Sequence, residues 1–268
     1  MNNVMQLLQY KINYRDNIFQ ISGKSRKTDG DLIFFIHGLG CAKESFDNVW
    51  KYGEFNKYSI LTIDLPGHGD SSKPHDFSYK MEEYAEILKK ILRKYHDKNI
   101  HLVGHSMGGT IALLLIDIIP HRIKSFANIE GNLYSSDSGI SRKAAALSYN
   151  TFKEILFNKI KVYAVQSENK GERLWASWIE KSDPYAFNKS SKSLVQWTDS
   201  GKLLQKFLKL KCRKEYFYGE YNSFMEVMIK IEGIKKTSIS KSGHFPMNDN
   251  PNEFYRKLLA FIQLENST

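Results

Sequence analysis

A serine flanked by two glycines is the residue in this sequence whose surroundings best suit covalent chemistry. The segment 104–108, Gly-His-Ser-Met-Gly, lies between apolar stretches at 100–103 and 111–116. We expect the first stretch to be a buried strand and the second a helix that stops at Pro120. Ser106 then occupies a sharp strand-to-helix turn, where glycines relieve crowding and the hydroxyl projects above the sheet edge. Such a hydroxyl suits nucleophilic attack in acyl transfer.

A serine nucleophile of this kind needs a partner base. A serine hydroxyl is weakly nucleophilic at neutral pH, so a histidine must accept its proton and a third group must orient that histidine. His244 is the candidate because it follows a predicted strand in a glycine-containing loop, which brings it to the carboxyl edge of the sheet. The other seven histidines lie in backbone motifs or at predicted surface and strand positions.

The elements that must position these residues alternate between strand and helix. An alternating pattern within 4–23 predicts an antiparallel hairpin at the sheet edge. Apolar runs and helical spacing then predict strands at 32–36, 59–63, 100–103, 124–129, 215–219 and 236–240, and helices at 81–95, 223–231 and 251–264. This order predicts an α/β fold with a mostly parallel central sheet and helices on both faces.

Regular alternation stops between the strands at 124–129 and 215–219. Residues 132–210 contain amphipathic stretches and no clear strand, so we expect a helical cap inserted into a core made of 1–131 and 211–268. Large aromatic residues of this segment could line an apolar pocket, although their spacing also suits ordinary buried helix faces. They are Trp175, Trp178, Tyr185, Phe187 and Trp197.

These features resemble the α/β-hydrolase superfamily over roughly residues 30–130 and 210–265. The resemblance rests on the serine motif, on strand 32–36 running into His37-Gly38-Leu39-Gly40, on the turn 64–71 (Asp-Leu-Pro-Gly-His-Gly-Asp-Ser) and on 242–246 (Ser-Gly-His-Phe-Pro). It implies an α/β-hydrolase fold. It also implies that the backbone N–H groups of Leu39 and Met107 hold the substrate oxyanion.

The resemblance leaves the third catalytic residue open. The commonest family arrangement has an Asp in the loop after strand 215–219, where this chain has Asn222. An amide cannot carry the charge that stabilises an imidazolium. Some family members take the acid from the end of the preceding core strand, and there this chain has Glu130. We therefore assign the acid to Glu130, with Glu220, or Asn222 as a weak orienting residue, as alternatives.

The combined prediction is a cofactor-free serine hydrolase that cleaves a small carboxylic ester or thioester through an acyl-enzyme. The serine argues against the carbon attack that an Asp performs in dehalogenases and epoxide hydrolases of this fold. The sequence contains no metal-binding or phosphate-binding motif. The same serine also suits an acyltransferase, a carbon–carbon hydrolase or a peptidase. Asn222 keeps a further alternative open, a non-catalytic ligand-binding protein on a hydrolase fold.

The amino-acid composition and charge limit the classes of binding partner that we expect. The 268 residues are 41% hydrophobic, which is typical of a globular protein. The net charge is +10, but the lysines are scattered and no dense basic run with interleaved aromatics predicts a nucleic-acid partner. Segment 132–210 holds 13 Lys and Arg against seven Asp and Glu, which indicates acidic ligands only weakly.

The sequence also predicts the redox state of the cysteines and the location of the protein in the cell. Cys41 and Cys212 have no metal-site or disulfide spacing, so we expect reduced thiols. An uninterrupted apolar window of about 18 residues is missing, so we expect no stable membrane insertion. The first residues lack a basic region followed by a long apolar one, which predicts a cytoplasmic protein. No feature of the sequence indicates an oligomeric state.

Overall fold

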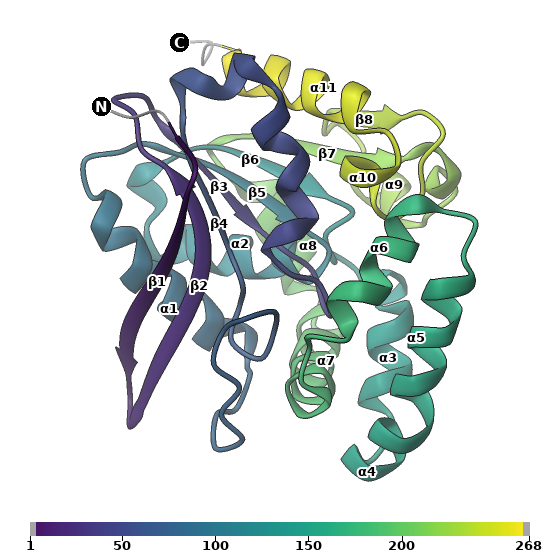
Figure 1. The fold of residues 1–268 in the computed structure, drawn as a ribbon. Helices are drawn as coiled ribbons and strands as arrows, with labels where there is room; N and C mark the ends of the chain where they lie inside the picture. The colour runs from purple at the N-terminus through teal and green to yellow at the C-terminus, as the bar shows by residue number, and fades with distance from the viewer. Residues whose placement is uncertain (1–3, 265–268) are drawn as a thin grey trace.

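The apolar runs of the sequence form the middle of one twisted sheet in the computed structural model, which describes residues 4–264 (Figure 1). Within that range the sheet has eight strands in the order β1-β2-β4-β3-β5-β6-β7-β8. They are β1 (Gln6–Tyr14), β2 (Asn17–Arg26), β3 (Leu32–Ile36), β4 (Ser59–Ile63), β5 (Ile100–His105), β6 (Ile123–Ile129), β7 (Arg213–Gly219) and β8 (Lys236–Ile239).

Strand direction follows from the connections. β1 and β2 form the predicted antiparallel hairpin at one edge, and β2 pairs antiparallel with β4. From β4 to β8 every neighbouring pair is parallel. All residues of β3, β4 and β5 are buried, which explains why apolar residues predominate in these strands. The predicted mostly parallel α/β sheet is therefore confirmed.

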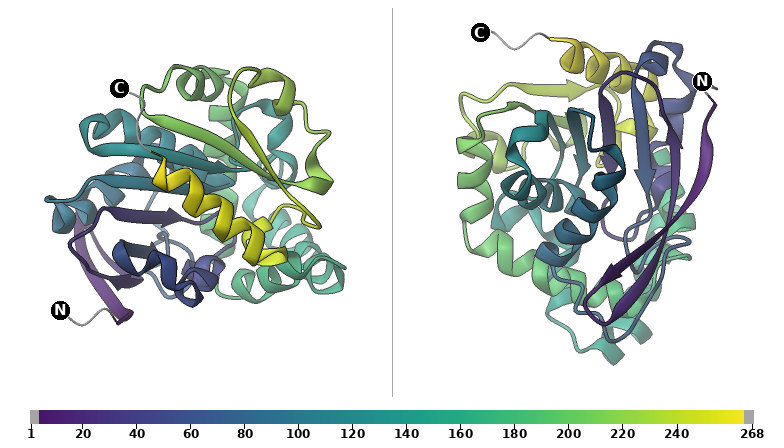
Figure 2. Two further views of the ribbon diagram at one scale, coloured as in Figure 1. Left: turned by 90° about the horizontal axis from the view of Figure 1, so that it is seen from above. Right: turned by 90° about the vertical axis from the view of Figure 1, so that its left-hand side faces the viewer.

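Helices cover both faces of the sheet (Figures 1 and 2). Phe217 of β7 packs against Phe254 and Phe261 of α11, whereas Phe126 of β6 packs against Phe207 of α8. The core helices are η1 (Lys43–Lys51), η2 (Gly53–Lys57), α1 (Met81–Leu92), η3 (Arg93–Tyr95), α2 (Met107–Ile118), η4 (Pro120–Arg122), η7 (Glu220–Asn222), α9 (Val227–Lys230), α10 (Pro246–Asp249) and α11 (Pro251–Gln263).

The segment between β6 and β7 contains only helices among the described residues. It comprises η5 (Ser135–Asp137), α3 (Gly139–Ala145), α4 (Tyr149–Thr151), η6 (Phe152–Leu156), α5 (Phe157–Gln166), α6 (Lys170–Ile179), α7 (Pro184–Asp199) and α8 (Lys202–Lys209). Figure 1 shows α3 to α7 gathered beside one end of the sheet, whereas α8 packs on β6 and α2. Helices α3 to α7 of this segment thus lie beside one end of the sheet, whereas its last helix, α8, packs on the sheet and on α2. The outermost parts of the predicted core, residues 1–3 and 265–268, lie outside the described range.

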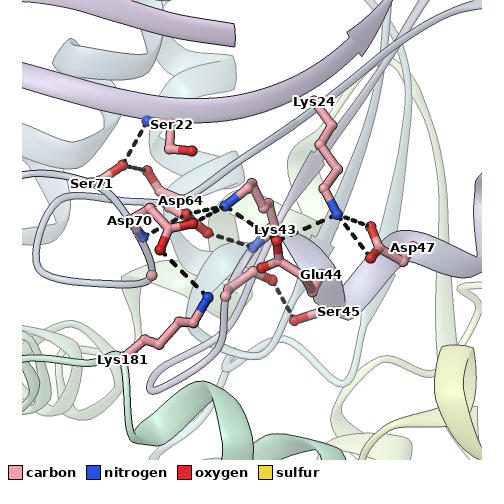
Figure 3. A network of polar contacts seen from close by, with 12 residues as sticks. Ser22, Lys24, Lys43, Glu44, Ser45, Asp47, Asp64, Asp70, Ser71 and Lys181 are labelled. Carbon is pink, nitrogen blue, oxygen red and sulfur yellow. Dashed lines mark hydrogen bonds and ion pairs between the residues drawn. The ribbon is translucent and has the colours of Figure 1, made fainter. Parts of the chain in front are cut away.

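A buried lysine ties the loop after β3 to the turn after β4 (Figure 3). The Lys43 ammonium donates to Asp64 Oδ2 at 2.7 Å and to Asp70 Oδ2 at 2.8 Å. The Lys43 backbone N–H donates to Asp64 Oδ1 at 2.7 Å. Lys43 is 3% exposed and Asp64 is fully buried. This network holds the start of η1, and with it the loop 37–42, in one position.

Replacing Lys43 with methionine should lower the free energy of unfolding by about 3–5 kcal/mol, because Asp64 then keeps a buried charge without its cation. Lys181 offers a matched control, since its half-exposed ammonium lies 3.5 Å from the Asp70 carboxylate. Lys181→Met should cost at most about 1 kcal/mol. Urea denaturation of both variants measures the difference, and equal costs would contradict the structural role of Lys43.

Within residues 4–264, no helix combines the length and apolar character needed to cross a membrane. Cys41 and Cys212 are free thiols. Burial raises the pKa of the Cys41 thiol to about 12, so this thiol stays protonated at neutral pH.

Candidate active site

Ser106 lies on a strained turn between the end of β5 and the start of α2. Its backbone has φ 51° and ψ −123°, a conformation that non-glycine residues rarely adopt and that is common at functional sites. A Cβ on Gly108 would lie 2.2 Å from the carbonyl oxygen of Ile36 in β3. A Cβ on Gly104 would lie 2.7 Å from the carbonyl oxygen of Gly108. The two glycines thus allow strand, turn and helix to approach closely enough to form this bend.

His244 and Glu130 lie in hydrogen-bond contact. His244 follows β8, Glu130 follows β6, and 2.7 Å separates His244 Nδ1 from Glu130 Oε2. Because the carboxylate accepts at Nδ1, the neutral imidazole carries its proton there and Nε2 remains an acceptor. Glu130 is 1% exposed, and its Oε1 accepts the Gly219 N–H at 2.8 Å. The carboxylate is thus held from two sides.

The two alternatives for the acid have other contacts. The Asn222 amide donates to Glu130 Oε1 at 3.0 Å and to Glu130 Oε2 at 2.8 Å. Glu220, which is exposed, accepts the Lys241 backbone N–H at 2.9 Å. Asn222 therefore supports the carboxylate that faces His244, and Glu220 binds elsewhere on the surface.

The charge of Glu130 acts on the histidine. Burial by itself lowers the pKa of His244, but the hydrogen bond and charge of Glu130 raise it above 6.5, with smaller contributions from Glu172 and Asp249. The imidazolium is thus favoured in this site, as a proton-accepting base requires.

The pH dependence of turnover should reflect this balance. If His244 must be neutral to accept a proton, kcat/KM falls as the pH drops through its raised pKa, so the acid midpoint should lie above 6.5. Without the Glu130 carboxylate, the pKa of His244 should fall, because the effect of burial is then no longer offset by that charge and hydrogen bond. A pH–rate profile of the wild type and an NMR titration of His244 in Glu130→Gln test both statements. A titration unchanged by Glu130→Gln would contradict them.

The residues predicted to hold the oxyanion flank the serine. Met107 is the first residue of α2, where backbone N–H groups have no acceptor within the helix. Leu39 lies in the loop after β3, and its carbonyl oxygen accepts the Trp175 indole N–H from α6 at 3.1 Å. Helix α6 thereby contacts the loop that carries the Leu39 N–H group.

Ser106, His244 and Leu39 line one cavity of about 280 Å³. Of the five aromatic residues considered for a pocket, Trp175 is the one that lines this cavity in the described chain. The other four are buried or partly buried against the hydrophobic core; they are Trp178, Tyr185, Phe187 and Trp197. Segment 132–210 therefore supplies a single one of these rings to the cavity beside the serine.

The sequence indicates only a backbone role for His105, but its side chain contacts the histidine loop. Its Nε2 donates to the His244 carbonyl oxygen at 2.8 Å, and the two rings lie 4.8 Å apart between centroids. Burial holds the pKa of His105 well below 6.5, with a smaller contribution from His244. A neutral His105 therefore fixes the backbone at His244 without adding charge.

Asp249 links helix α6 to the loop that contains His244. Its Oδ1 accepts the Gly171 N–H of α6 at 2.6 Å, and its Oδ2 accepts the Gly243 N–H at 3.0 Å. A Cβ on Gly171 would lie 2.2 Å from the Phe245 Cβ, so the helix and the loop are in close contact. The sequence around Asp249 carries no motif that predicts this link.

A group of three or more His, Cys, Asp or Glu side chains suited to a metal ion does not occur in residues 4–264.

Comparisons with known proteins agree on the family and the fold. A family model described as alpha/beta hydrolase fold matches residues 31–251. A Mycoplasma genitalium protein named among the esterases and lipases is 30% identical over 110 residues, which are 41% of this chain and 40% of that protein. Protein phosphatase methylesterase 1 of Candida albicans is 24% identical over 269 residues, 91% of this chain and 72% of that protein. The match thus spans about two fifths of the Mycoplasma protein.

Solved structures extend the likeness over nearly the whole chain. An esterase from Thermogutta terrifontis has a TM-score of 0.78 at 15% identity, covering 96% of this chain and 98% of that one. An N-acyl homoserine lactonase, solved with N-hexanoyl homoserine, has a TM-score of 0.78 at 18% identity, covering 99% and 100%. At such identities the likeness concerns the fold alone.

Proposed function

The chain belongs to the α/β-hydrolase family, and on that premise we propose that it hydrolyses small carboxylic esters or thioesters through an acyl-enzyme on Ser106. The observation that most supports this function is the 2.7 Å contact between Glu130 and His244, in a cavity that His244 shares with Ser106. The esterase and lipase names of several relatives agree with an ester substrate.

In the proposed acylation step, Ser106 Oγ attacks the substrate carbonyl carbon while His244 Nε2 takes the hydroxyl proton. The buried Glu130 charge stabilises the imidazolium that forms. The carbonyl oxygen becomes an oxyanion that accepts hydrogen bonds from the Leu39 and Met107 N–H groups. The carbon–oxygen or carbon–sulfur bond then breaks, and the alcohol or thiol leaves with the proton held by His244.

Deacylation repeats these steps with water. His244 takes a proton from a water molecule, whose oxygen attacks the acyl carbon and forms a second oxyanion in the same place. Collapse of this intermediate breaks the bond to Ser106 Oγ, which recovers its proton from His244. The carboxylic acid product then departs.

Covalent labelling tests the proposal. A fluorophosphonate probe should label the folded protein at Ser106, identified by peptide mass spectrometry, and should not label protein unfolded in urea beforehand. Folded protein that remains unlabelled under conditions where a known serine esterase reacts would overturn the proposal. Product analysis with and without added alcohols or amines separates hydrolysis from acyl transfer, and amide or carbon–carbon substrates separate the remaining alternatives.

The alternative of a non-catalytic binding protein rests on Asn222. Because the Asn222 amide donates to Glu130, its presence does not imply a missing carboxylate beside His244. Hydrolysis is therefore the better supported proposal.

A further inference from the structure

The cavity beside Ser106 has a charge opposite to that of the whole chain. The chain carries a net charge of +10, but the lining residues of the cavity include no Lys or Arg within residues 4–264. Asp137 of η5 and Glu172 of α6 both line it. The lysine excess of segment 132–210 therefore does not reach this cavity. A ligand inside it meets carboxylates from the cap.

Among the described residues, no Lys or Arg forms an ion pair with either of these carboxylates. Burial raises the pKa of Asp137 to about 6, although the Leu133 and Tyr134 N–H groups donate to its Oδ2. The charge of Glu172 contributes to the raised pKa values of Tyr163 and His244. The effect of the Glu172 charge on these two groups indicates a negative potential beside the cavity, which favours a positively charged ligand.

Buried hydrogen-bond acceptors without donors lie behind the surface of the cavity. Among the described residues, Asn132 Oδ1 and Asp137 Oδ1 are buried and have no hydrogen-bond partner. The Asn132 amide orientation is determined, because its Nδ2 donates to the Asp137 carbonyl oxygen at 2.6 Å. Asn132 is 3% exposed and lines the cavity. A buried acceptor without a donor is costly, so a ligand N–H group that reached it would gain a hydrogen bond the protein does not supply.

Aromatic side chains also face this part of the molecule. The aromatic rings of Trp175 and Phe245 line the same cavity. Aromatic rings attract cations through their faces, so they add to the preference set by the carboxylates.

We propose that this cavity is a specificity site for a protonated amine, and that the preferred substrate is a small ester or thioester with an ammonium group on its acyl or leaving part. The ammonium would take Asp137 and Glu172, which both line the cavity, as counter-charges. The substrate part of this inference rests on the proposed function, whereas amine binding does not depend on turnover.

Binding is tested with three probes of similar size: n-butylammonium, 1-butanol and butyrate. Calorimetry on the Ser106→Ala protein should show n-butylammonium binding about tenfold or more tightly than 1-butanol, with butyrate weakest, because two carboxylates attract the cation. Tetramethylammonium, which has charge but no N–H group, should bind less tightly than n-butylammonium. The same rank order should hold for competitive inhibition of p-nitrophenyl acetate hydrolysis by the wild type.

Variants assign the preference to the cavity. Asp137→Asn combined with Glu172→Gln should remove most of the discrimination between n-butylammonium and 1-butanol. Glu168→Gln, an exposed cap residue outside the cavity lining, should retain it. Circular dichroism checks that the double variant is folded, and Glu172→Gln alone should reduce the discrimination in part.

Three results would overturn the inference: butyrate binding as tightly as n-butylammonium, discrimination unchanged in the double variant, or no measurable binding of any probe. Amine binding to Ser106→Ala without hydrolysis by the wild type would instead reject the proposed function and keep the amine site. Hydrolysis by the wild type without a preference for amines would reject the amine site and keep the proposed function.

Discussion

Replacing Ser106 with alanine should lower kcat/KM for p-nitrophenyl acetate by about 10³–10⁶, because the reaction loses its nucleophile and retains only binding and oxyanion stabilisation. Alanine keeps the Cβ that already occupies the strained turn, so the thermal midpoint should change little. Stopped-flow or steady-state kinetics and differential scanning calorimetry on the same preparation measure the two quantities.

The matched control for this variant is Ser177→Ala. Ser177 is an exposed serine of α6 outside the cavity lining, and its hydroxyl donates to the Leu174 carbonyl oxygen. This control should keep the wild-type rate within about twofold, since surface substitutions usually have small effects. Residual activity of Ser106→Ala equal to that of the control would reject Ser106 as the nucleophile.

The second large effect concerns Glu130. Glu130→Gln should lower kcat/KM by about 10³–10⁴, because a neutral amide neither stabilises the imidazolium nor fixes the reactive tautomer. Asn222→Asp alone should also lower activity, since a second carboxylate then lies beside Glu130 Oε2, where the amide nitrogen is now 2.8 Å away. In the double variant, which combines Glu130→Gln with Asn222→Asp, position 130 has no carboxylate and position 222 has one. The activity of this double variant should rise about tenfold or more above that of Glu130→Gln.

Asn222→Asp is thus expected to lower activity when Glu130 is present and to raise it when Glu130 is replaced. These opposite effects would identify Glu130 as the acid. A destabilising substitution that helps only in the absence of Glu130 cannot act through general damage to the fold. Glu220→Gln serves as the control and should leave the rate unchanged, because Glu220 is exposed and accepts a backbone N–H from Lys241. The assignment of Glu130 would be wrong if Glu220→Gln were the more damaging change.

The core strands can be predicted from the sequence because a strand that is buried on both faces consists mainly of consecutive apolar residues. Strands β3 and β4 have the bounds expected from their apolar runs, and β8 differs by one residue. The helix expected at 223–231 is shorter and spans Val227–Lys230. Edge elements and short helices depend more on contacts with distant segments, so their bounds are less visible in the sequence.

Some residues of the candidate site can be recognised from motifs in the sequence, and others cannot. Ser106 and His244 lie in glycine-containing motifs, and Glu130 was singled out by an absent Asp at position 222. Asp137 and Glu172 are ordinary polar residues whose shared location depends on how η5 and α6 pack. Aromatic content is a poor guide to the cavity, since most of the large rings considered in segment 132–210 pack in or against the hydrophobic core.

The two backbone amides bound by Asp249 have a mechanical consequence. One belongs to Gly171 at the start of α6 and the other to Gly243 next to His244, so one carboxylate holds both the helix and the loop of His244. Moving α6 outward to admit a bulky molecule would cost the hydrogen bond from Gly171 and leave the loop with one of the two anchors of Asp249. An engineer who grafts a foreign lid onto this scaffold has to transplant a glycine that faces Asp249, or supply another anchor for the loop.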